Sequence, residues 1–125
     1  MKNFVNLFII IVSLIFVLSA CNQTQGVDKK LYSDGQELIS MINTSLDNTD
    51  TKIPKKISMS INRFGHNYSI RDKKITSKKD IDFAQTVATT YVNYANYITN
   101  DDGNEMEKMY GNLAKLETKY KIKID

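Results

Sequence analysis

The amino-acid sequence predicts an all-α protein, a small bundle of three to four helices. Two observations favour this class. Apolar residues recur at helical spacing over residues 28–47, over 77–100 and again after residue 104. Polar or glycine-containing breaks separate these segments at 48–52 and 100–104. An α+β fold with a short hairpin within residues 55–76 is the alternative.

The first predicted helix, 28–47, carries apolar residues on one face: Leu31, Leu38, Ile39, Ile42 and Leu46. Their spacing is that of a helix with one buried side. Gly35 interrupts the segment and is expected to weaken an isolated helix by up to about 1 kcal/mol relative to alanine.

The segment 77–100 is the clearest helix and is expected to be central. Ser77 is placed to cap its start, and Asp80 lies in the first turn. The predicted buried stripe comprises Ile81, Ala84, Val87, Ala88, Tyr91, Val92, Ala95 and Ile98, widened by Phe83 and Tyr94. The residues expected opposite it are Gln85, Thr89, Asn93 and Asn96. A stripe this wide indicates contact with two other helices.

A last helix follows the turn at 100–104. Its expected buried face comprises Met106, Met109, Leu113, Leu116 and Tyr120. Glu105 near its start and Lys119 near its end suit the helix dipole.

The segment 53–75 is ambiguous. Ile57, Ile61, Phe64 and Tyr68 fall on one helical stripe, yet residues 57–61 also alternate as a strand would. A hairpin turning through residues 71–74 is the competing interpretation. We favour a helix because Phe64 and Tyr68 extend the helical stripe and not the alternation.

The N-terminal segment has the character of a signal peptide. Lys2 precedes an apolar run from Leu7 to Leu18, which is shorter than a membrane-spanning helix requires. The run closes on Leu18-Ser19-Ala20-Cys21, which is similar to the lipobox of bacterial lipoproteins, the substrates of type II signal peptidase. The alternative is an uncleaved membrane helix from Phe4 to Leu18.

The resemblance implies cleavage before Cys21 and a lipid, such as a palmitate-containing diacylglyceryl group, on its sulfur. The lipid would hold the protein on the extracytoplasmic face of the cell membrane. We therefore expect a signal peptide at 1–20, the lipidated cysteine and a polar tether at 21–27, and one small globular domain at 28–125. Cys21 is the only cysteine, so an internal disulfide is excluded. The excess of lysine over arginine and the abundant asparagine favour an AT-rich, Gram-positive source.

Positive charge is concentrated in the middle of the chain. Between residues 52 and 79 there are nine cations and a single acid, Asp72. The cations are Lys52, Lys55, Lys56, Arg63, Arg71, Lys73, Lys74, Lys78 and Lys79. This asymmetry predicts binding to a polyanion such as anionic lipid or a wall polymer, against the alternative of a solvated basic face. No specific nucleic-acid partner is expected.

Residues that carry chemistry are few. His66 is the only histidine and has no partner motif around it. Residues 101–105 offer oxygen ligands but lack the spacing of a calcium loop. No metal site, cofactor site or nucleotide-binding motif is indicated. Tyr91 and Tyr94 are expected in the core, and Tyr97 at its edge. The sequence thus predicts a protein that is not an enzyme.

Three functional classes follow from these observations. The first is a non-catalytic, membrane-anchored surface lipoprotein that acts by binding or contact, for instance an exclusion, immunity or transfer protein of a mobile element. The second is the precursor of a short apolar peptide pheromone released from residues 14–20. The third is a cell-wall enzyme or its regulator.

Overall fold

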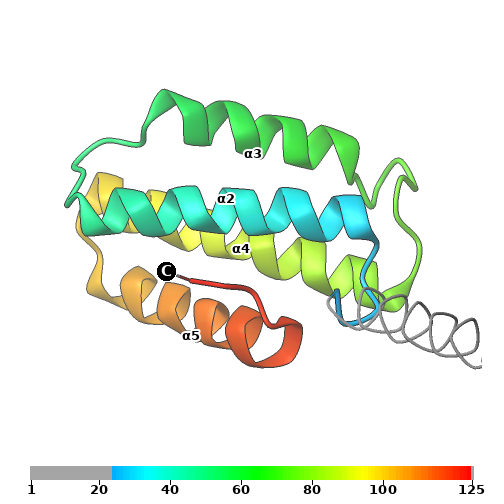
Figure 1. Ribbon diagram of the computed structural model, residues 1–125. Helices are drawn as coiled ribbons and strands as arrows, with labels where there is room; N and C mark the ends of the chain where they lie inside the picture. The colour runs from blue at the N-terminus through cyan, green and yellow to red at the C-terminus, as the bar shows by residue number, and fades with distance from the viewer. Residues whose placement is uncertain (1–23, 125) are drawn as a thin grey trace, which may run out of the picture.

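The computed structural model describes residues 24–124 as a bundle of four helices. They are α2 (Lys29–Asp47), α3 (Lys55–Asn67), α4 (Lys78–Asn100) and α5 (Gly103–Tyr120). Successive helices run in opposite directions, and α4 contacts the other three (Figure 1). No strand occurs within the described range. The predicted all-α class, with the segment 77–100 as its central helix, is confirmed.

The helices begin and end at residues whose side chains or backbone form hydrogen bonds with the N–H and C=O groups at the helix ends. Ser77 Oγ accepts from the Asp80 backbone N–H over 3.1 Å, as predicted. Asp28 and Asp102 cap α2 and α5 in the same way. Asp101 adopts a left-handed conformation, with φ of 50°, and ends α4 before α5 begins.

The ambiguous segment 53–75 is a helix followed by turns. Within α3, Ile57 and Phe64 are buried, and Ile61 and the neighbouring Tyr68 pack against the core. The hairpin alternative is absent, because residues 68–77 form turns and not strands. The Tyr68 hydroxyl donates to Asp34 of α2, which helps to hold the end of α3 against α2.

The buried face of α4 is rotated from the predicted stripe. Val92 is 51% exposed and Ala88 and Ala95 are only half-buried, whereas Asn93 is 6% exposed. The predicted positions of Val92 and Asn93 are therefore wrong. Because α4 contacts three helices, polar residues also face inward there. Their groups find partners: the Asn93 side-chain amide donates to Glu105 Oε2 over 2.8 Å.

Two threonines on this inward face satisfy their hydroxyls within α4 itself. Thr86 Oγ1 and Thr90 Oγ1 each donate to the carbonyl four residues earlier over 2.7 Å. A pattern of apolar residues cannot reveal such positions, since a threonine that bonds its own helix can be buried like a valine.

Gly35 lets α2 approach α4 closely. A Cβ at this position would lie 2.6 Å from the Phe83 ring, closer than carbon atoms pack. Phe83 is fully buried between Tyr32, whose ring centroid is 5.5 Å away, and Tyr120, at 5.2 Å. The glycine that weakens the isolated helix thus makes room for the aromatic centre of the core.

Both ends of the described chain pack onto the bundle. Residues 24–27 form a turn whose Val27 is 3% exposed, so the folded domain begins before the predicted end of the tether at residue 27. At the other end, Ile122 is buried and the Lys123 backbone N–H donates to Gln36 Oε1 over 2.9 Å. Asn43 binds the carbonyl of Ile124. The C-terminal segment therefore runs back along α2.

Candidate functional site

Several chain segments meet at the end of the bundle from which the chain leads back toward Cys21. They are the start of α2, the loop between α3 and α4 with the first turn of α4, and the end of α5 (Figure 1). The Asp28 backbone N–H donates to Asp80 Oδ1 over 2.9 Å and ties α2 to α4. The Tyr120 hydroxyl donates to Asp82 and ties α5 to α4. We call this region the basic end and define it as residues 24–31, 67–80 and 117–121.

Cations outnumber acids at the basic end by nine to four. All nine are exposed: Lys29, Lys30, Arg71, Lys73, Lys74, Lys78, Lys79, Lys119 and Lys121. Lys119 pairs with Asp82 over 3.1 Å. The other eight form no ion pair within residues 24–124. The excess positive charge therefore faces solvent.

Three of the four acids are engaged by other groups. Asp28 Oδ2 accepts from the Leu31 backbone N–H over 3.1 Å, and Asp80 Oδ1 accepts from Asp28. Asp72 Oδ2 accepts from the Ser69 hydroxyl over 3.0 Å. These carboxylates cap helix starts and a turn, and within residues 24–124 they form no ion pair with the lysines around them.

The loop between α3 and α4 is a defined turn that presents an apolar side chain. The Lys74 backbone N–H donates to the Ser69 carbonyl over 2.9 Å, and the Asp72 N–H donates to Ser69 Oγ over 3.1 Å. Ile75, 9% exposed, fastens the loop to the core. Ile70 is 39% exposed and lies directly before Arg71. An isoleucine is thereby displayed among cations.

The predicted polyanion-binding residues do not form one surface. Arg71, Lys73, Lys74, Lys78 and Lys79 lie at the basic end. Lys52, Lys55 and Lys56 lie near the start of α3, at the opposite end of the bundle (Figure 1). The length of α3 separates the two groups by about 18 Å, which exceeds the screening length of about 8 Å at physiological ionic strength. The two groups therefore act as separate patches.

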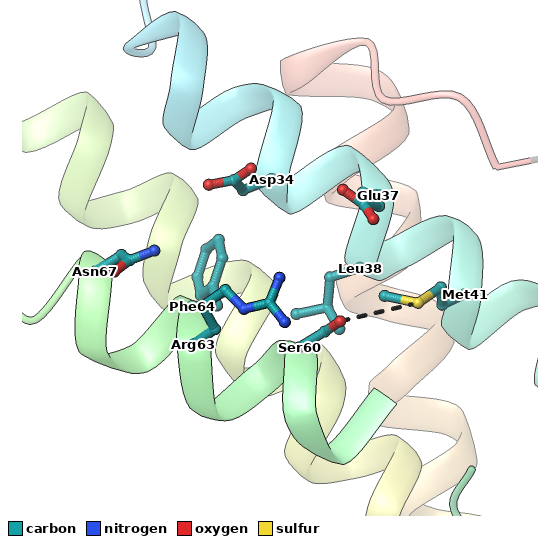
Figure 2. A pocket seen from close by; sticks show the side chains of 8 residues that line it. All are labelled: Asp34, Glu37, Leu38, Met41, Ser60, Arg63, Phe64 and Asn67. Carbon is teal, nitrogen blue, oxygen red and sulfur yellow. Dashed lines mark hydrogen bonds between the residues drawn. The ribbon is translucent and has the colours of Figure 1, made fainter. Parts of the chain in front are cut away.

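The ninth predicted residue, Arg63, lies in a groove between α2 and α3 (Figure 2). Asp34 and Glu37 of α2 line the same groove, together with Phe64 and Asn67 of α3. Its volume is about 50 Å³. This is room for a few water molecules, each of which needs about 10–15 Å³ by this measure.

Four cations of the basic end were missed from the sequence: Lys29, Lys30, Lys119 and Lys121. They flank the first and last helices and lie far in sequence from the basic segment. In an up-and-down bundle of four helices, the start of the first helix and the end of the last lie at the same end. Applied to the predicted helices, that rule would have placed these four lysines at the same end of the bundle.

Asp82 lies next to the basic end, outside its defined residues, and joins α4 to α5. Lys115 Nζ contacts its Oδ1 over 2.9 Å, and Lys119 and the Tyr120 hydroxyl contact its Oδ2. These hydrogen bonds, that of Lys115 foremost, hold the pKa of Asp82 well below its usual range. Asp82 therefore bridges two lysines of α5, of which only Lys119 belongs to the basic end, and the eight other cations there form no ion pair within residues 24–124.

The opposite end, which we call the acidic end, comprises residues 46–57 and 97–108. It carries six acids and four cations. A hollow of about 450 Å³ opens there between the loop after α2 and the α4–α5 turn. Tyr97 and Tyr110 line it with Asp50 and Asp101, and Tyr110 is 55% exposed.

The remaining predicted residues belong to neither end as defined, or lie outside the described range. His66 is exposed in the last turn of α3, and Tyr94 is fully buried, as predicted. The lipobox residues Leu18, Ser19, Ala20 and Cys21, like the rest of the predicted signal peptide, lie outside residues 24–124. Across that range, no three potential metal ligands converge. Nor is any of its helices long and apolar enough to cross a bilayer.

Comparisons with protein-family models, with curated proteins and with solved structures gave no match.

Proposed function

We propose that this protein is a lipid-anchored bacterial surface lipoprotein that acts by contact and not by catalysis. The sequence Leu18-Ser19-Ala20-Cys21 carries the proposal. The described domain supports it, because residues 24–27, a few positions after Cys21, already form a turn whose Val27 is buried against the core. Signal peptide, anchor and domain would thus follow one another with almost no spacer.

The arrangement of the domain supports contact as its mode of action. Its largest concentration of unpaired groups is the exposed basic end, a surface suited to binding another surface. His66 forms no hydrogen bond with another side chain in the described part of the chain. We propose that the protein works by what its surface binds, in the manner of an exclusion, immunity or transfer protein.

Substitution of Cys21 tests the anchor. Cys21→Ser should abolish incorporation of labelled palmitate and leave an unprocessed precursor or protein released into the medium. Asn22→Ser, one position later, is the matched control and should be labelled and processed normally. Normal labelling and membrane retention of Cys21→Ser would contradict the proposal.

The finer role can be tested by deletion of the gene in its host. An exclusion or transfer protein should change the frequency of conjugation into or out of the cell, and an immunity protein should change survival under a toxin or phage. Restoration by the wild-type gene but not by Cys21→Ser would link the role to the anchor. An unchanged phenotype in all three assays would contradict this finer role.

A further inference from the structure

We propose that the basic end rests on anionic phospholipid headgroups, with Ile70 inserted among them. This inference rests on the proposed lipid anchor and adds to it a defined orientation of the domain. It makes the membrane itself the first partner of the folded part.

Charge gives the first argument. The basic end carries an excess of five positive charges, and eight of its exposed cations have no ion-pair partner within residues 24–124. Each lysine or arginine near an anionic membrane contributes about 1 kcal/mol of attraction. The corresponding attraction at the acidic end is absent, since acids exceed cations there.

The position of the anchor gives the second argument. Three residue steps join Cys21 to Thr24, and they span at most about 11 Å. The Lys79 side chain lies against Gly26 in the turn that begins the domain. The lipid therefore keeps Lys79 and its neighbours near the headgroups, and their charges come within the screening length of about 8 Å when the domain rests on the membrane. A distant basic patch would gain little from the same charge.

The loop before α4 gives the third argument. Its hydrogen-bonded turn displays Ile70 beside Arg71, and Lys73 and Lys74 follow. An exposed apolar side chain flanked by cations matches the membrane interface, where apolar groups reach below the charged headgroups.

The orientation has a consequence for the rest of the molecule. With the basic end on the membrane, the helices stand away from it and the acidic end faces outward. The hollow lined by Tyr97 and Tyr110 would then be the part most accessible from outside the cell.

A tryptophan reporter tests the contact, because the chain contains no tryptophan. Ile70→Trp and, as a matched control, Met59→Trp are purified as full lipidated chains and reconstituted into vesicles that contain brominated lipid. Met59 is 52% exposed on α3, outside the basic end. In phosphatidylglycerol vesicles, fluorescence at position 70 should be quenched and fluorescence at position 59 should not. Phosphatidylcholine or high salt should reduce the quenching at position 70.

Paired substitutions on the Ile70→Trp background separate the two groups of lysines. Changing Lys73 and Lys74 to Gln should remove most of the quenching that depends on phosphatidylglycerol. Changing Lys55 and Lys56 to Gln removes the same charge at the acidic end and should leave the quenching intact. Equal losses from the two pairs would overturn the assignment to the basic end.

Three further outcomes separate the lipid anchor from the contact, and lipid from wall polymer as the partner. Flotation with phosphatidylcholine vesicles reports the lipid anchor alone, so its failure counts against the proposed function and not against the contact. Absence of quenching at position 70 in phosphatidylglycerol, or equal quenching at position 59, would overturn the contact. Loss of quenching when soluble teichoic acid is added would assign the basic end to wall polymer in place of lipid.

Discussion

The two ends of the bundle use their acidic side chains in similar ways but differ in the charge that remains. At the basic end, Asp28 and Asp80 accept from backbone N–H groups and leave the lysines beside them unpaired. At the acidic end, Asp102 caps α5 and Glu105 accepts from the Asn93 and Asn96 amides. The comparison teaches that the charge of each surface follows from its balance of lysines and acids, nine cations to four acids at one end and four cations to six acids at the other, because a carboxylate that accepts hydrogen bonds keeps its charge.

The two ends also differ in how their interiors are filled. Beneath the basic end, Phe83 packs against Tyr32 and Tyr120. Toward the acidic end, a buried polar pair replaces part of the apolar packing, with Ser45 Oγ and Tyr94 Oη 2.5 Å apart. The acidic end contains a hollow, whereas packed aromatic rings lie beneath the basic end. A firmly packed interior suits the basic end as a contact surface.

Phe83→Ala should cause the largest loss of stability. Removing a fully buried phenylalanine should cost about 3–5 kcal/mol in the free energy of unfolding, because the cavity would open between two other aromatic rings. Urea denaturation measures the loss. Val92→Ala on the exposed side of α4 is the control and should stay within about 0.5 kcal/mol. Similar losses for both would show that the aromatic cluster does not support the basic end.

Gly35→Ala should cause the next largest loss of stability. The added methyl group would meet the Phe83 ring at 2.6 Å and force α2 away from α4. Overpacking of this kind costs about 1–3 kcal/mol. Gly65→Ala in α3 is a matched control, since no atom beyond its chain neighbours and its own helix backbone lies within 4 Å of the added carbon. That change should stabilise the helix by up to about 1 kcal/mol. Thermal unfolding should move in opposite directions for the two variants.

Tyr94→Phe tests the polar interior toward the acidic end. Loss of the hydroxyl leaves buried Ser45 without this partner, which should cost about 1–3 kcal/mol. The double change Tyr94→Phe and Ser45→Ala should recover part of the loss, because both polar groups are then removed. A double variant less stable than the sum of the single changes would contradict this account.

Acid should weaken the link between α4 and α5 at the basic end. The folded-state pKa of Asp82 lies below its unfolded value of about 3.9, because Lys115, Tyr120 and Lys119 donate to the carboxylate. Its contribution is therefore present above about pH 4 and is lost as the pH falls through the acid range. The difference in unfolding free energy between wild type and Asp82→Asn should shrink from pH 5 to pH 2.

The smallest effects on stability are expected from the paired lysine changes. Lys73 and Lys74, like Lys55 and Lys56, are exposed and form no ion pair within the described residues. Either pair changed to Gln should alter the unfolding free energy by less than about 0.5 kcal/mol. A large loss of unfolding free energy would show that these charges stabilise the fold. Reduced membrane binding by the variants could then result from unfolding.

The sequence by itself determined the helical class, the order of the helices and most of the core. Apolar spacing identified the buried faces of α2 and α5, and Ser77 marked the start of α4, because these features depend on neighbours within a few residues. It also supplied the lipobox, a local motif that the described residues do not include.

Tertiary structure decided which residues share a surface. It rotated the inward face of α4 to bury Asn93 and expose Val92, because Glu105 on another helix satisfies the asparagine. It made Gly35 a contact point, since only the approach of Phe83 requires the missing Cβ. It also placed the cations of residues 52–79 at two opposite ends of the bundle. Those at the basic end share its surface with Lys29 and Lys121, which are far away in sequence. Local patterns cannot specify such groupings, because they arise where the chain reverses and distant helix ends meet.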